Sequence, residues 1–144
     1  MKNTVIISGF PGIGKTYLFE NSPLSILDSD SSKFDKTMFP QNYIEHIKEN
    51  IGKVDIILVS SHKEVREALV CEKIDFTLVY PHESLKSEYI EKYKERGSSE
   101  KFIQLISDNW NNWIEELKNQ KNCIHNVLNS GITLYMFIHF EHSA

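Results

Sequence analysis

The sequence has few of the residues that would suggest a secreted or membrane protein. It contains two cysteines, Cys71 and Cys123, with no C-x-x-C pair and no zinc-ligand spacing. We expect reduced packing thiols, because 40% hydrophobic residues can build a core without disulfides. No apolar run reaches the roughly 18 residues of a membrane span, and no signal peptide is expected where a strand starts almost at once. The cytoplasm is the expected compartment.

Positive charge is also scarce. The chain carries 20 acidic residues against 16 Lys and Arg, which gives a net charge of −4. Broad binding to nucleic acid needs a basic face, so we expect no nucleic-acid partner, although a local basic cleft remains compatible with this balance. Arginine occurs only as Arg66 and Arg96. Because the planar guanidinium of arginine can bind two phosphate oxygens at once, the chain can form few such bidentate contacts.

Strand-like and helix-like segments alternate along the chain, without repeats or a proline-rich linker, so residues 1–144 are expected to form one domain. Alternation of this kind predicts an α/β fold, a five-stranded parallel sheet flanked by helices in three layers. The expected strands are residues 3–8, 24–27, 55–59, 76–80 and 123–128. The expected helices are residues 15–21, 41–51, 63–71, 84–96 and 100–119. The apolar segment 132–140 closes the domain as a helix or a strand.

One motif points directly to chemistry. Residues 9–16 read Gly-Phe-Pro-Gly-Ile-Gly-Lys-Thr, which matches the P-loop (Walker A) pattern G-x-x-x-x-G-K-[ST] between a predicted strand and a predicted helix. Its backbone amides would cradle phosphates at a helix N-terminus. Lys15 would reach the β- and γ-phosphates, and the Thr16 hydroxyl would bind Mg²⁺. The predicted nucleotide contacts are Gly9, Pro11, Gly12, Ile13, Gly14, Lys15, Thr16 and Tyr17.

Two carboxylates follow the second expected strand, at the sheet edge where ligands of such folds bind. Asp28 ends the strand and Asp30 projects beyond it. Phosphoryl transfer needs a metal and a group that orients the nucleophile, so both are candidate metal-side residues and Asp30 is the favoured acceptor-side residue. The alternative is that residues 28–32 form only a hydrogen-bonded turn and helix cap.

The third expected strand lacks the Walker B aspartate that many P-loop NTPases place at its end. It ends in Val59-Ser60-Ser61-His62, and Asp55 lies at the opposite end of the strand. This absence argues against a motor ATPase or a GTPase. Ser60 could hold a magnesium-bound water and His62 could contact an acceptor, although a surface histidine without a catalytic role is an equal alternative.

Residues 84–100 are a candidate lid. The helix ends in Arg96 beside Gly97-Ser98-Ser99, and Lys92 lies one turn earlier. A basic helix on a glycine hinge could close over a transferring phosphoryl group, or it could be a solvated helix of mixed charge. Arg66 could bind a phosphate of the acceptor or pair with a glutamate of its own helix. Trp110 and Trp113 lie on the apolar side of the longest helix and are expected to pack in the core.

Three segments together resemble a known family: the P-loop itself, Leu27-Asp28-Ser29-Asp30, and Leu78-Val79-Tyr80-Pro81 followed by a helix that ends in Tyr93-Lys94-Glu95-Arg96-Gly97. They resemble the small P-loop kinases related to adenylate, shikimate and gluconate kinase, and more closely the compact nucleotide-kinase-like proteins of bacteriophages. The resemblance spans most of the chain. It implies the P-loop NTPase fold, ATP and Mg²⁺ as cofactors, and an acceptor-side role for Asp30. Lids in these kinases usually carry several arginines, whereas this one has only Arg96.

The resulting hypothesis is an ATP- and Mg²⁺-dependent kinase acting on a nucleoside or nucleoside monophosphate. Lys15, Asp30 and Arg96 would be its catalytic residues, and Ser60, His62, Arg66 and Lys92 would contact the substrate. A polynucleotide 5′-kinase is a second possibility, against which the acidic balance argues. A nucleotide-binding regulatory or host-interaction protein without turnover is a third, and the missing Walker B aspartate favours it.

Overall fold

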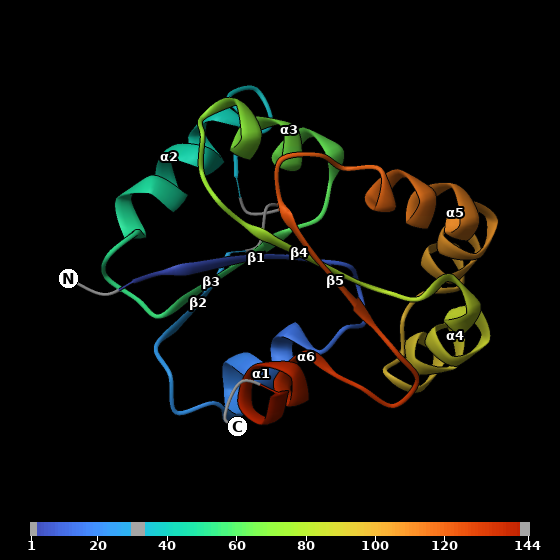
Figure 1. Ribbon diagram of the computed structural model, residues 1–144. Helices are drawn as coiled ribbons and strands as arrows, with labels where there is room; N and C mark the ends of the chain where they lie inside the picture. Colours follow the sequence, from blue (N-terminus) through green and yellow to red (C-terminus); the bar gives the residue numbers. More distant parts are fainter. Residues whose placement is uncertain (1–2, 30–33, 142–144) are drawn as a thin grey trace.

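The computed structural model describes residues 3–29 and 34–141, with side chains as far as residue 139. It is an α/β structure in which a five-stranded, all-parallel sheet is flanked by helices (Figure 1). The sequence-based expectation of this architecture is confirmed. The predicted acceptor residue Asp30 lies outside the described residues.

The sheet has the strand order β2-β3-β1-β4-β5. Its strands are β1 (Val5–Gly9), β2 (Ile26–Asp28), β3 (Ile56–Ser60), β4 (Thr77–Pro81) and β5 (Ile124–Leu128). The central strands are rich in β-branched residues and buried on both faces, as parallel strands between helical layers require. Because β1 is central, the loop that follows it lies between the carboxyl ends of β3 and β4.

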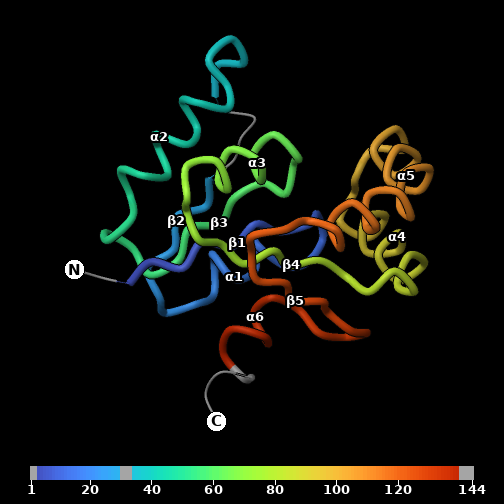
Figure 2. Tube along the Cα trace, turned by 45° about the horizontal axis from the view of Figure 1, so that its top comes forward, coloured from blue at the N-terminus to red at the C-terminus, as the bar shows by residue number. Residues whose placement is uncertain are grey.

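Helices cover both faces of this sheet. Helices α1 (Lys15–Asn21) and α6 (Leu134–Met136) lie on one face, and α2 (Gln41–Asn50) and α3 (Lys63–Cys71) lie on the other (Figure 1). The remaining pair, α4 (Lys86–Glu95) and α5 (Glu100–Lys118), lies side by side beyond the carboxyl end of β4 (Figure 2). Short helical turns η2 (Glu83–Leu85) and η3 (Phe137–Glu141) precede α4 and follow α6.

Most predicted boundaries are within two residues of those observed, and α3 has the predicted bounds. Two details differ: the predicted helix 84–96 begins with the separate turn η2, and Pro81 is the last residue of β4 instead of lying beyond it. Of the two forms expected for segment 132–140, the structure has the helix, as α6 and η3. Cys71 is exposed at the end of α3, contrary to the expected packing role, whereas Cys123 is half-buried; neither forms a disulfide.

The core is aromatic at the carboxyl end of the sheet. Trp110, Tyr43, Tyr89 and Tyr93 are the largest fully buried side chains. Each also has a polar atom, so burial at this end of the molecule brings hydrogen-bonding groups close to the loops that follow the strands. Within the described ranges, no helix has the length and apolar character needed to cross a membrane.

Candidate functional site

The P-loop turns sharply between β1 and α1. Gly12 and Gly14 have φ angles of 91° and 101°, the left-handed region that glycine adopts without strain. Gly9 is needed for a different reason, since a Cβ there would lie 2.6 Å from Cδ1 of Ile13. The glycine spacing of the motif is therefore required by backbone geometry and packing as well as by any ligand.

The loop presents unsatisfied donors. The N–H groups of Gly12, Gly14 and Thr16 have no hydrogen-bond acceptor among the described residues, because they precede the first complete turn of α1. The Lys15 ammonium donates a 2.7 Å hydrogen bond to the Gly9 carbonyl and so lies across the loop. Orphan amides beside an ammonium at a helix start are donors of the kind that bind anions, and the phosphate contacts of these residues stay a prediction.

Two hollows meet at Lys15 and Pro11. The first, called here the α4 cleft, has a volume of about 570 Å³ and is lined by Pro11, Gly12, Gly14, Lys15, Thr16, Lys92, Glu95 and Arg96. The second, called the α5 cleft, has a volume of about 660 Å³. Its lining includes Asp28, Ser60, His62, Arg66 and Trp113, besides Lys15. Every described candidate residue from the sequence, apart from Ile13 and Tyr17, thus lines one of two neighbouring clefts.

In the α4 cleft, two cations of the predicted lid lie over aromatic rings. The Lys92 ammonium is 4.3 Å from the ring centre of Tyr89, and the Arg96 guanidinium is 5.0 Å from that of Tyr93. Arg96 Nε also donates to Ser98 Oγ at 3.0 Å. These contacts restrict both side chains to the side of α4 that faces the P-loop, while Arg96 as a whole remains exposed.

Two tyrosines of α4, Tyr89 and Tyr93, pack against the P-loop. The sequence analysis did not identify either as a functional residue. The Tyr93 hydroxyl donates a 2.7 Å hydrogen bond to the Pro11 carbonyl. Burial raises the pKa of Tyr93 far above its ordinary value, with a smaller lowering effect from Arg96. Burial, and secondarily the charge of Glu88, raises the pKa of Tyr89 to about 12. Both hydroxyls therefore stay protonated at physiological pH.

The α5 cleft places Asp28 at its rim. This carboxylate is exposed and has no hydrogen-bond or ion-pair partner within the described part of the chain. Two residues of α2 bind the neighbouring Ser29. Tyr43 donates a 2.6 Å hydrogen bond to its carbonyl, and His46 Nε2 is hydrogen-bonded to its Oγ at 3.1 Å. The Tyr43 hydroxyl also accepts from the Ser60 amide at 3.3 Å. Tyr43 thus connects the two strand ends that border the cleft.

Arg66 is buried and already paired. It donates to the Ser61 carbonyl at 2.8 Å and to Gln120 at 2.6 Å, and it forms an ion pair with Glu116. The prediction of a glutamate partner on its own helix was wrong, because the partner comes from α5. Arg66 and Glu116 are 50 positions apart in sequence, and only the tertiary fold brings their charges together.

Some predicted contacts lie elsewhere. The Tyr17 side chain packs on Tyr135 of α6, with ring centres 5.4 Å apart, so only its backbone remains at the P-loop. Ile13 is fully buried, and its carbonyl accepts from Leu134. Thr16 lines the α4 cleft whereas Asp28 lines the α5 cleft. No three His, Cys, Asp or Glu side chains of the described residues form a metal-binding group.

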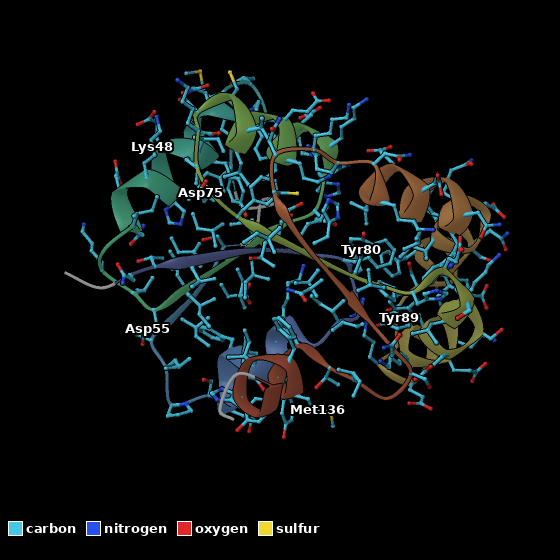
Figure 3. All side chains as sticks on the ribbon, in the orientation of Figure 1. Lys48, Asp55, Asp75, Tyr80, Tyr89 and Met136 are labelled. Carbon is cyan, nitrogen blue, oxygen red and sulfur yellow. The ribbon has the colours of Figure 1, made fainter. Side chains whose placement is uncertain are left out.

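The expected position of Asp55, at the opposite end of β3 from Ser60, is confirmed, since Asp55 directly precedes Ile56. Its carboxylate accepts hydrogen bonds from the amide and hydroxyl of Ser25 at 2.9 and 3.1 Å. In Figure 3 it lies at the opposite end of the sheet from Tyr80 and Tyr89. The strand β3 indeed ends in Ser60 without a carboxylate.

The two tryptophans of α5 have different environments. Trp110 is fully buried, as expected, and its indole N–H donates to the Glu83 carbonyl. Trp113 is only partly buried and lines the α5 cleft. Their shared helical spacing did not distinguish them, because spacing along a helix does not say which distant residues cover each ring. Compared with known proteins, the chain matches no family model and no curated protein sequence.

Proposed function

We propose that this protein is an ATP- and Mg²⁺-dependent phosphotransferase with the three-layer P-loop NTPase fold, acting on a nucleoside or a nucleoside monophosphate. One observation carries the proposal: Lys15 lies where two clefts meet, one with orphan amides and lid cations and the other with a carboxylate and hydroxyls. A kinase needs two such compartments, since donor and acceptor must meet at one phosphorus atom.

The α4 cleft suits the donor. The P-loop amides would bind the phosphates of ATP, and Lys15 would leave the Gly9 carbonyl to bind the β- and γ-phosphates. Lys92 and Arg96 would stabilise the transferring group from the lid, segment 84–100. Loop 129–131 is bound to α4, with the Gly131 amide donating to Glu88, and would lie near the base. The oxygen donors Thr16 and Asp28, with Asp30 as predicted from sequence, are of the type that Mg²⁺ prefers.

The α5 cleft suits the acceptor. An acceptor hydroxyl there would attack the γ-phosphorus, forming one P–O bond while the bond to the β-phosphate oxygen breaks and ADP leaves. The hydroxyl proton would pass to a carboxylate, for which Asp28 is placed in the cleft and Asp30 is the sequence-based candidate. Ser60 and His62 would orient the acceptor. Bound Mg²⁺ would neutralise charge that develops on the phosphates.

Calorimetry tests the donor half of this proposal. Titration of Mg–ATP should give saturable heat with the wild type and with Lys53→Ala, an exposed lysine between α2 and β3. Lys15→Ala should weaken binding at least about tenfold. ADP release in a coupled assay should then depend on an acceptor from a panel of nucleosides and nucleoside monophosphates. No heat with the wild type, or equal heat with Lys15→Ala, contradicts the proposal.

A second candidate is nucleotide binding without turnover, in a regulatory or host-interaction role. The end of β3 favours it, since Ser60 stands where a Walker B carboxylate would be. Tight Mg–ATP binding without ADP release, unchanged by Asp28→Asn and Asp30→Asn, would support this candidate over the kinase. For either function the proposed location is the cytoplasm, of the bacterial host if the protein is phage-encoded.

A further inference from the structure

We infer that the α5 cleft takes an uncharged acceptor with a flat ring and a hydroxyl group, such as a nucleoside, and discriminates against its monophosphate. This specificity rests on the proposed phosphotransferase function and narrows its substrate class. Two independent features of the cleft wall support this inference. One is a half-buried indole ring that lines the cleft without a described ring contact or hydrogen bond, and the other is an arginine whose charge is already compensated.

Trp113 supplies the indole face. It is half-buried, it lines the cleft, and it makes no ring contact or hydrogen bond within the part of the chain that the structure describes. Trp110, three residues earlier, differs in each respect: it is fully buried, lies 5.5 Å from the Phe10 ring centre and donates its N–H. Leu105, about two turns earlier on α5, lines the same cleft and is 52% exposed. A half-buried indole and an exposed leucine on one cleft wall offer apolar surface to a flat ring.

Arg66 supplies the discrimination. The residue is 3% exposed, and its guanidinium donates to Ser61, Gln120 and Glu116. The Glu116 carboxylate itself lines the cleft and compensates the arginine charge. The guanidinium has acceptors in Ser61, Gln120 and Glu116, so a phosphate on the acceptor would have to displace the partly exposed Glu116 carboxylate and would lie beside its negative charge.

The other charged groups of the cleft do not restore a phosphate site. Lys15 is assigned to the donor phosphates, and Asp28 adds a negative charge. Lys63 is exposed at the rim, with its ammonium 3.8 Å from Glu67. Among the described lining residues, Ser60 and Ser61 contribute hydroxyls that suit the hydroxyls of a sugar. A volume of about 660 Å³ is ample for a nucleoside.

The test compares nucleosides with their 5′-monophosphates. Each is titrated into the protein with a non-hydrolysable Mg–ATP analogue while tryptophan fluorescence is recorded, and each is assayed for ADP release with ATP. We expect at least one nucleoside to quench the emission and to have a kcat/KM at least tenfold above that of its monophosphate. Quenching should disappear in Trp113→Leu, which should keep its affinity for Mg–ATP.

Glu116→Gln provides the second arm. Releasing the Arg66 charge should raise kcat/KM for the monophosphate at least tenfold relative to the nucleoside. Glu115→Gln removes a neighbouring exposed charge that does not line the cleft and should leave the ratio unchanged. Preference for monophosphates in the wild type, or an unchanged ratio in folded Glu116→Gln, overturns the inference while the kinase proposal stands. Absence of quenching by every nucleoside overturns it as well, and the Lys15→Ala calorimetry judges the kinase proposal separately.

Discussion

The Tyr93 hydroxyl donates a hydrogen bond of 2.7 Å to the Pro11 carbonyl, across eighty-two positions of sequence. The contact is possible because Gly12 has no side chain: a Cβ there would lie 2.8 Å from Cε1 of Tyr93. The P-loop and α4 are therefore directly packed against each other. Substitution of Tyr93 or Gly12 should therefore lower both the free energy of unfolding and the affinity for Mg–ATP.

Tyr93→Phe should destabilise the protein by about 1 kcal/mol, because it removes this hydrogen bond and leaves a carbonyl without its partner. Mg–ATP affinity should fall as the P-loop loosens. Urea unfolding and calorimetry measure the two effects. The matched control is Tyr89→Phe, since the Tyr89 hydroxyl is buried and has no hydrogen-bond partner in the described structure. That variant should be neutral or slightly stabilising; equal losses in both would contradict a specific role for the Tyr93 bond.

Gly12→Ala should be more damaging. The φ of 91° strains any L-residue, and the added methyl would meet both tyrosine rings of α4. We expect a loss of about 2 kcal/mol or more, together with at least tenfold weaker Mg–ATP binding. Gly52→Ala is the control, because φ is also 91° there and the residue follows α2, outside both clefts. It should reduce stability through strain and leave nucleotide affinity unchanged.

Substitutions of Asp28 and Asp55 should have different effects, the first on catalytic activity and the second on stability. Asp28→Asn changes an exposed carboxylate without a described partner, so ADP release should fall at least about tenfold with the melting temperature unchanged. Asp55→Asn weakens two hydrogen bonds from Ser25 at the other end of the sheet. It should cost about 1–2 kcal/mol of stability and leave kcat nearly constant. Thermal melts and the coupled assay distinguish these patterns, and a reversed pattern would place the chemistry elsewhere.

Stability should fall at alkaline pH. Burial raises the pKa of Tyr89 from 10 to about 12, and it raises that of Tyr93 as well. As pH rises, the tyrosines of the unfolded chain lose their protons before those of the folded chain. Their contribution to the free energy of unfolding is therefore complete below pH 10 and is lost as pH rises through the pKa values of the folded state. The slope is about 1.4 kcal/mol per pH unit for each group. Urea unfolding at pH 8, 10 and 11 should show the decline, and it should be shallower in Tyr89→Phe.

Local patterns were sufficient for the architecture. The β-branched runs of β1 and β3 predicted buried parallel strands, and the glycines of residues 9–14 predicted a sharp turn, which the structure makes with positive φ angles at Gly12 and Gly14. These features depend on near neighbours in sequence. Side-chain periodicity and the steric limits of the backbone hold whatever surrounds the segment.

Long-range pairing decided what each cleft contains. Arg66 and Trp113 have local sequence contexts that allow several roles, and their surroundings depend on how α5 packs across β4 and α3. The sequence by itself determined that a glycine-rich turn follows the first strand, since that turn needs only consecutive residues. Only the tertiary structure decided that Glu116 compensates Arg66 and that Trp113 faces a cleft, because charge compensation and burial arise between side chains that are distant along the chain.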